Sequence, residues 1–193
     1  MFPPLPKARG NLKPGILYAV SGENDWAYYG QITSEKFVGF FKRRDKIVAP
    51  IEDILTAPIL SIVPVSFPSI GRALRSGLWQ ALGRFELVQE LRQPKTMVQW
   101  PVGTNVVTVW CGSNQQYDTR VEDPAIQNLE VIAAWDAEYH IPERLTADFG
   151  IETAGWSVGG PVWRERRIKQ EMARRFPDQP WHELTDNWVW TSN

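Results

Sequence analysis

The sequence predicts a mainly β protein of the α+β class. We expect a strongly bent antiparallel sheet or a small SH3-like barrel, with a few short helices and a C-terminal helix. Short apolar stretches, many with period-two alternation, recur between turn residues, as is typical of strands. Gly30 and Gly39 fall inside such stretches, where bulges or tight barrel corners are expected. Only residues 162–176 form a long helical pattern without a breaker.

The predicted strands are rich in β-branched and aromatic residues, and turn residues follow some of them, such as the Ser21–Asp25 cluster and Pro101. Residues 128–135 fit either a strand or a helix, and we prefer a strand because Leu129, Val131, Ala133 and Trp135 alternate. The remaining predicted strands are 15–20, 26–32, 37–41, 59–65, 79–88, 97–100 and 106–111.

Two short helices and one longer C-terminal helix are predicted between and after these strands. Ser69 is a suitable N-cap for a helix through Leu74, and Gly77 would end it. Ile141-Pro142 would begin a second helix that ends before Gly150. The third covers 162–176 and ends before Pro177.

A chain of 193 residues with ten tryptophans can bury a sizeable core within one domain of ordinary size. The first twelve residues contain three prolines and predict an extended N-terminal arm. We expect a β-rich domain over 13–150 and a helical extension, 151–193, packed on that domain.

Location in the cytoplasm is favoured by several features. Cys111 is the single cysteine, which excludes an internal disulfide framework. The uncharged runs 54–71 and 96–117 are interrupted by prolines or by polar residues, so neither predicts a membrane span. The N-terminal residues lack the pattern of a signal peptide.

Charge is distributed unevenly, although the formal net charge is only −1. Residues 118–152 carry nine acids against two arginines, and residues 164–175 carry six bases against two acids. A net charge near zero argues against direct nucleic-acid binding, which requires many cations to neutralise phosphate. The basic segment is explained as well by a solvated helix face or by pairing with the acidic block.

No set of catalytic residues stands out. His140 and His182 lie far apart in the sequence, and neither a metalloprotease motif, a phosphate-binding loop nor a nucleophile elbow occurs. Cys111 ends a predicted core strand, where a small buried residue is the commoner role. We therefore expect no catalytic residue, no metal site and no cofactor. A hydrolase that uses the clustered carboxylates stays open as an alternative.

Aromatic residues in the early strands leave another alternative open. Six of them could form a stacking platform for a carbohydrate or nucleic-acid ligand on a small barrel: Trp26, Tyr28, Tyr29, Phe37, Phe40 and Phe41. The same residues would equally fill the interior of that barrel.

Several motifs together resemble the bacterial immunity protein 26 family. An opening glycine and apolar strand precede a Tyr-x-Tyr-Gly-like strand, a Trp-x-x-x-Gly element and a closing Glu-x-x-x-x-Trp-Asp with a downstream Arg-Leu. Ile16 departs from the pattern, because an acid often follows the opening glycine, and the resemblance ends near Gly150. The matching positions are Gly15, Tyr28, Tyr29, Gly30, Trp79, Gly83, Glu130, Trp135, Asp136, Arg144 and Leu145.

The resemblance implies an immunity protein of a polymorphic toxin or contact-dependent inhibition system. Such a protein binds a cognate toxin domain stoichiometrically, and that toxin could be a basic nuclease; the oligomeric state stays open. Complementary charge would guide the encounter, so the acidic block is the candidate interface, unless its acids are merely solvated. The interface residues that we expect are Asp136, Glu138, Glu143 and Asp148, with Trp156 as an aromatic anchor.

The junction between Trp135 and Asp136 should mark the edge of the core. We expect Trp135 to pack inward, while Asp136 caps the following turn or helix. A partly buried link between a carboxylate and Arg144 is an alternative role for Glu130 and Asp136.

Overall fold

The computed structural model describes residues 1–101 and 104–149. These residues form two compact units. The first unit contains Met1–Pro94 and residues 133–149, and the second contains Lys95–Ile132. Within the described residues there are nine strands and only three short α-helices, so the mainly β prediction is confirmed.

The first unit is built on one five-stranded antiparallel sheet with the order β4-β3-β2-β1-β5. Its strands are β1 (Ile16–Ser21), β2 (Ala27–Ile32), β3 (Val38–Asp45), β4 (Ile59–Val63) and β5 (Trp79–Arg84). Between and after them lie the 3-10 turns η1 (Glu23–Asp25) and η2 (Gln89–Leu91), and the helices α1 (Ile51–Leu55), α2 (Phe67–Ser76) and α3 (Ile141–Asp148).

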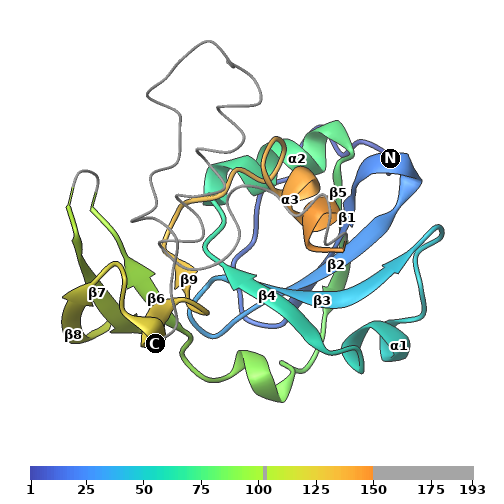
Figure 1. Cartoon of the computed structure of the whole chain (residues 1–193). Coiled ribbons are helices and arrows are strands. Elements are labelled where there is room, and N and C mark those ends of the chain that lie inside the picture. Colours follow the sequence, from blue (N-terminus) through green and yellow to red (C-terminus); the bar gives the residue numbers. More distant parts are fainter. Residues whose placement is uncertain (102–103, 150–193) are drawn as a thin grey trace, which may run out of the picture. The chain divides into compact units, whose positions relative to one another are not determined.

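One face of this sheet carries the larger core. Alternate residues of the strands, such as Tyr18, Tyr28 and Phe40, point to this face and are fully buried. Helices α2 and α3 cover it together (Figure 1), contributing Ile70 and Leu145 among others. Residues 133–149 therefore return to the first unit because their apolar side chains complete its core.

The opposite face is covered by shorter pieces of chain. A Cβ on Gly39 would lie 2.3 Å from the Leu91 side chain of η2, so only glycine admits this contact. The hydroxyl of Tyr29 accepts a hydrogen bond from the Ala49 backbone N–H at 3.0 Å. Helix α1 contacts β3 nearby. The sheet of the first unit is thus covered on both faces.

Two other glycines have the roles that their positions predict. The register between β2 and β3 shifts between Tyr28 and Gly30, which is the expected bulge. Gly77 ends α2 in the left-handed conformation with a φ of 78°, as predicted for the helix stop.

The second unit is a four-stranded sheet with the order β8-β7-β6-β9, in which β6 and β9 are parallel. Valines of β6 and β7 form a small core with Val121 and Ile126. The elements are β6 (Thr96–Gln99), β7 (Val106–Cys111), β8 (Asn114–Arg120), η3 (Pro124–Ile126) and β9 (Glu130–Val131).

Several predictions of detail were wrong. The sheets are open, so the barrel alternative does not hold, and two sheets stand where one was expected. The predicted strand 128–135 is reduced to β9 and an isolated bridge between Trp135 and Val65. Helix α2 begins earlier than predicted, after Ser66 rather than Ser69, and β5 ends at Arg84 rather than Val88. Helix α1 and strand β8 were not predicted.

The N-terminal segment 1–12 lies along α2 without regular strand or helix structure. Backbone N–H groups of Phe2 and Leu5 donate to the carbonyls of Gly77 and Leu74, at 2.8 and 3.1 Å. The predicted extension 151–193, with its helix 162–176, lies outside the described residues. Among the described helices, none has both the length and the apolar character needed to cross a membrane.

Candidate binding surface

The most distinctive exposed feature of the first unit is a tight turn at residues 136–140, which we call the acidic turn. The Asp136 carboxylate accepts hydrogen bonds from the backbone N–H groups of Glu138, at 2.8 Å, and Tyr139, at 3.2 Å. The backbone N–H of Asp136 donates to Nδ1 of His140 at 3.2 Å. An aspartate that bonds the backbone two and three residues ahead fixes a turn locally. Asp136 thus caps the turn, as expected.

Arg72 of α2 holds the acidic turn from outside. Its Nη2 lies 2.5 Å from Oδ2 of Asp136, and its Nε lies 2.9 Å from Oε2 of Glu138. Ser76, one helical turn further along, donates to Oε1 of Glu138 at 3.1 Å. The hydrogen bond with Glu138 raises the pKa of Arg72, so the guanidinium keeps its charge. Asp136 and Glu138 are therefore partly neutralised within the protein.

Buried polar contacts fix the turn from below. The backbone N–H of Ala137 donates to the hydroxyl of Ser69 at 2.8 Å, and the indole N–H of Trp79 donates to the Ala137 carbonyl at 2.9 Å. All three residues are fully buried. The acidic turn is consequently anchored to both α2 and β5, and its backbone is preorganised.

Three side chains leave this rigid base and face solvent. Tyr139 is 74% exposed, and His140 and Glu143 are also exposed. A large aromatic side chain on a fixed backbone is a typical anchor of protein interfaces, because it buries much area while losing little conformational entropy. The acidic turn with Glu143 therefore has the chemistry of a protein-binding surface.

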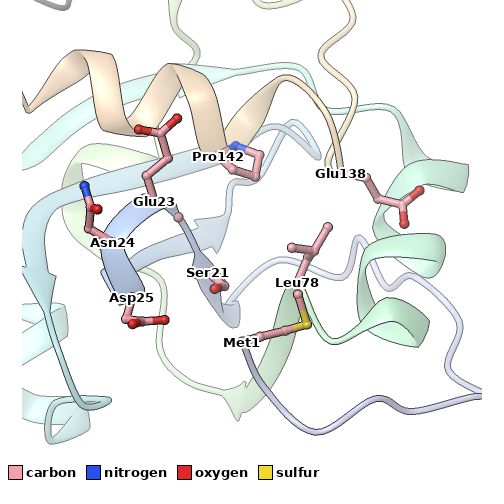
Figure 2. A pocket seen from close by; sticks show the side chains of 9 residues that line it. Met1, Ser21, Glu23, Asn24, Asp25, Leu78, Glu138 and Pro142 are labelled. Carbon is pink, nitrogen blue, oxygen red and sulfur yellow. The ribbon is translucent and has the colours of Figure 1, made fainter.

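A pocket of about 380 Å³ lies beside the acidic turn. Figure 2 shows Glu23 and Asp25 on one side of it and Glu138 on the other, with Ser21 between them. The complete lining is Met1, Ser21, Gly22, Glu23, Asn24, Asp25, Leu78, Glu138 and Pro142. Helix α3 contacts η1 here, which brings two acidic segments distant in sequence to one site.

Trp135 and Arg144 belong to the interior instead. Trp135 is 7% exposed and packs inward, as expected. The Arg144 guanidinium lies 4.4 Å from the centroid of the Trp135 ring. Its Nε lies 3.3 Å from the carboxylate of Asp148, whose side chain is 5% exposed. The carboxylate–arginine link is thus made by Asp148 rather than by Asp136. We therefore place Asp148 with the structural residues and not on the candidate binding surface.

Most of the other motif residues stabilise the fold rather than face solvent. Tyr28 and Trp79 are fully buried in the core. A Cβ on Gly15 would lie 2.3 Å from the carbonyl oxygen of Phe85, and Gly83 has a positive φ of 133°. Glu130 lies on β9 in the second unit. Trp156, the expected aromatic anchor, lies outside the described residues.

The alternatives from the sequence fit the geometry less well. Four of the six platform residues, Tyr28, Tyr29, Phe40 and Phe41, are 0% exposed, so these side chains cannot stack on a ligand. Trp26 and Phe37 are half-buried. In the described part of the chain, no group of three His, Cys, Asp or Glu side chains could hold a metal ion.

Sequence reasoning missed two parts of this surface. It interpreted residues 21–25 only as a turn cluster, although their two acids form one side of the pocket. It also missed Arg72, whose apolar neighbours in α2 gave no sign of a contact with residues more than sixty positions away. The two acids of η1, Glu23 and Asp25, were the sequence signal that could have indicated this part of the surface.

Comparisons of this chain with protein-family models, with curated proteins and with solved structures find no match. The family resemblance therefore depends on the sequence motifs alone.

Proposed function

We propose that this chain is an immunity protein that binds a cognate bacterial toxin domain in the cytoplasm and neutralises it stoichiometrically, without catalysis. The observation that carries the proposal is Tyr139, which is 74% exposed on a backbone fixed by Asp136, Arg72 and Trp79. The motif resemblance supports the same function.

Preorganisation explains why such a turn suits tight binding. Association loses affinity when loops and side chains must be ordered at the interface. The acidic turn is already ordered by hydrogen bonds to α2 and β5, so binding needs little further ordering of its backbone and loses little affinity in this way. Tyr139 can then bury its ring against the partner as a central anchor.

Charge gives the interface a preference for basic partners. Glu23, Asp25 and Glu143 are exposed acids near or on this surface. A toxin that cuts nucleic acid must present cations to phosphate, and an acidic surface would attract that same cationic face. Occupying this face would block the toxin by steric exclusion.

Rescue from toxicity tests the proposal directly. The full chain would be produced with the toxin candidate encoded next to it, and both survival and co-purification would be measured. Survival and a one-to-one complex are expected. Tyr139→Ala should weaken the complex at least about 30-fold, as expected for an anchor worth about 2 kcal/mol. The thermal stability of the Tyr139→Ala variant should equal that of the natural chain, because the Tyr139 side chain is exposed.

Tyr117→Ala provides the matched control, because Tyr117 is also an exposed tyrosine, at 47%, but lies on β8 of the second unit. This variant should protect as well as the natural chain. A complex that tolerates Tyr139→Ala but not Tyr117→Ala would move the interface away from the acidic turn. A chain that neither protects nor co-purifies would contradict the function itself.

A further inference from the structure

We infer that the pocket beside the acidic turn receives one cationic side chain, an arginine or a lysine, from the protein partner. The inference rests on the proposed function and names the chemistry that this part of the surface recognises. It goes beyond charge attraction in general, because a defined cavity would hold a single residue of the partner.

The size and walls of the pocket suit a long side chain. Its volume of about 380 Å³ is at the small end of the range for ligand sites, which is roughly 300–1,000 Å³. Met1, Leu78 and Pro142 contribute apolar lining. Arginine and lysine pack their aliphatic stems on apolar surface and keep their charged ends near polar groups. A lining with both characters fits such a side chain.

Ser21 gives an independent sign that the pocket is built for a ligand. Its side chain lines the pocket (Figure 2), although the residue is only 8% exposed. In residues 1–101 and 104–149, nothing forms a hydrogen bond with the Ser21 hydroxyl. The buried side-chain atoms without a partner in the described residues are those of Ser61 and Trp135, so the Ser21 hydroxyl is not sealed in the interior but opens to the pocket. A donor N–H entering the pocket would supply a partner for it.

Charge decides the sign of the occupant. Glu23 and Asp25 are exposed, and neither forms an ion pair with any residue that the structure describes. Glu138 also lines the pocket, but its two carboxylate oxygens already bind Arg72 and Ser76. Glu23 and Asp25 leave negative charge beside the cavity, which repels anions and attracts a cation, and the fork of an arginine can donate to both carboxylates.

Binding of single side chains to the full chain tests this inference without the toxin. The probes are the N-acetyl methylamides of arginine and of lysine, and the uncharged comparison is the same derivative of citrulline. Backbone amide NMR signals would be followed during titration. We expect the cationic probes to shift the signals of residues 21–25 with a millimolar dissociation constant, and the citrulline probe to leave them in place.

Glu23→Gln combined with Asp25→Asn is the variant that removes the free charges. Asp25 has a φ of 59°, and asparagine tolerates this left-handed conformation, so the fold should persist. Affinity for the cationic probe should fall at least about tenfold. Glu52→Gln, an exposed acid on α1, is the matched control and should bind as the natural chain does.

Ser21→Ala tests the buried hydroxyl and should also weaken binding while the pocket keeps its shape. Equal shifts with the citrulline probe, or shifts that persist in the double variant, would overturn the inference. So would an absence of shifts at residues 21–25. These outcomes leave the rescue experiment unaffected, and failure of rescue with normal probe binding would reject the immunity function instead.

Discussion

Arg144 lies with its guanidinium over the indole of Trp135, 4.4 Å from the ring centroid, and both residues are buried. Arg144 is one helical turn before Asp148, and its Nε lies 3.3 Å from that carboxylate. The ring and the carboxylate together compensate a charge that has been removed from water. The motif positions Trp135 and Arg144 thus form one structural contact.

Arg144→Leu should destabilise the first unit by about 3–5 kcal/mol, because it leaves the buried Asp148 carboxylate without this partner. Urea unfolding would measure the change. Arg92→Leu is the control, since Arg92 pairs with Glu86 at the surface, and its effect should stay below about 1 kcal/mol. Similar effects of the two substitutions would contradict the structural role of Arg144.

Trp79 connects the core to the acidic turn through its indole N–H and the Ala137 carbonyl. Trp79→Phe removes this donor and leaves a buried carbonyl without it, so the free energy of unfolding should fall by about 1–3 kcal/mol. Trp26→Phe should cost less than about 1 kcal/mol, because phenylalanine retains a ring on which Arg44 and Lys46 can lie. If Trp79→Phe left both stability and toxin binding unchanged, this connection would be unimportant.

Strand patterns were the part of the fold that sequence predicted best. In the first unit, alternate strand residues face a large core, so period-two alternation was visible. Strand β8 was missed because its residues are almost all exposed and show no alternation. Helix α1 has five residues, too few for a helical period. Residues 132–135 are positioned by tertiary bonds, such as the Trp135 N–H to the Pro64 carbonyl, which no local pattern reveals.

The sequence identified the acids near the candidate site, but not which of them are exposed and which are held within the protein. Asp136, Glu138, Glu143 and Asp148 are similar in sequence, yet Arg72 holds two of them and the core encloses Asp148. Only Glu143 is exposed without such a contact. Which acids face solvent depends on α2, whose position relative to residues 136–148 follows from packing. Charge patterning alone could not separate these cases.

Tyr29 should make stability depend on alkaline pH. Burial raises the pKa of its hydroxyl to about 12, despite the opposing effect of the Ala49 N–H. Because the ionised form is disfavoured in the fold, this contribution is fully present below about pH 10, the ordinary value, and is lost as the pH rises through the folded value. Stability of the natural chain should therefore fall more steeply over this window than that of Tyr29→Phe.

The same substitution has a second effect at neutral pH. Tyr29→Phe removes the acceptor of the buried Ala49 N–H, which should cost about 1–3 kcal/mol. The two stability curves should then converge as the pH rises, since the natural chain loses its advantage on ionisation. Parallel curves from neutral to alkaline pH would show that Tyr29 keeps an ordinary pKa. Urea unfolding at each pH provides the measurement.

If the chain has the proposed function, its association with the toxin should be fast and sensitive to salt. Exposed carboxylates at Glu23, Asp25 and Glu143 create a field that extends about 30 Å at 0.01 M salt but only about 8 Å at 0.15 M. We expect the association rate constant to fall by at least about tenfold between these conditions. Glu143→Gln should reduce both the rate at low salt and its salt dependence, whereas Glu52→Gln, on α1, should change neither. Stopped-flow measurements would show this, and a rate that does not respond to salt would mean that the partner is not guided by these acids.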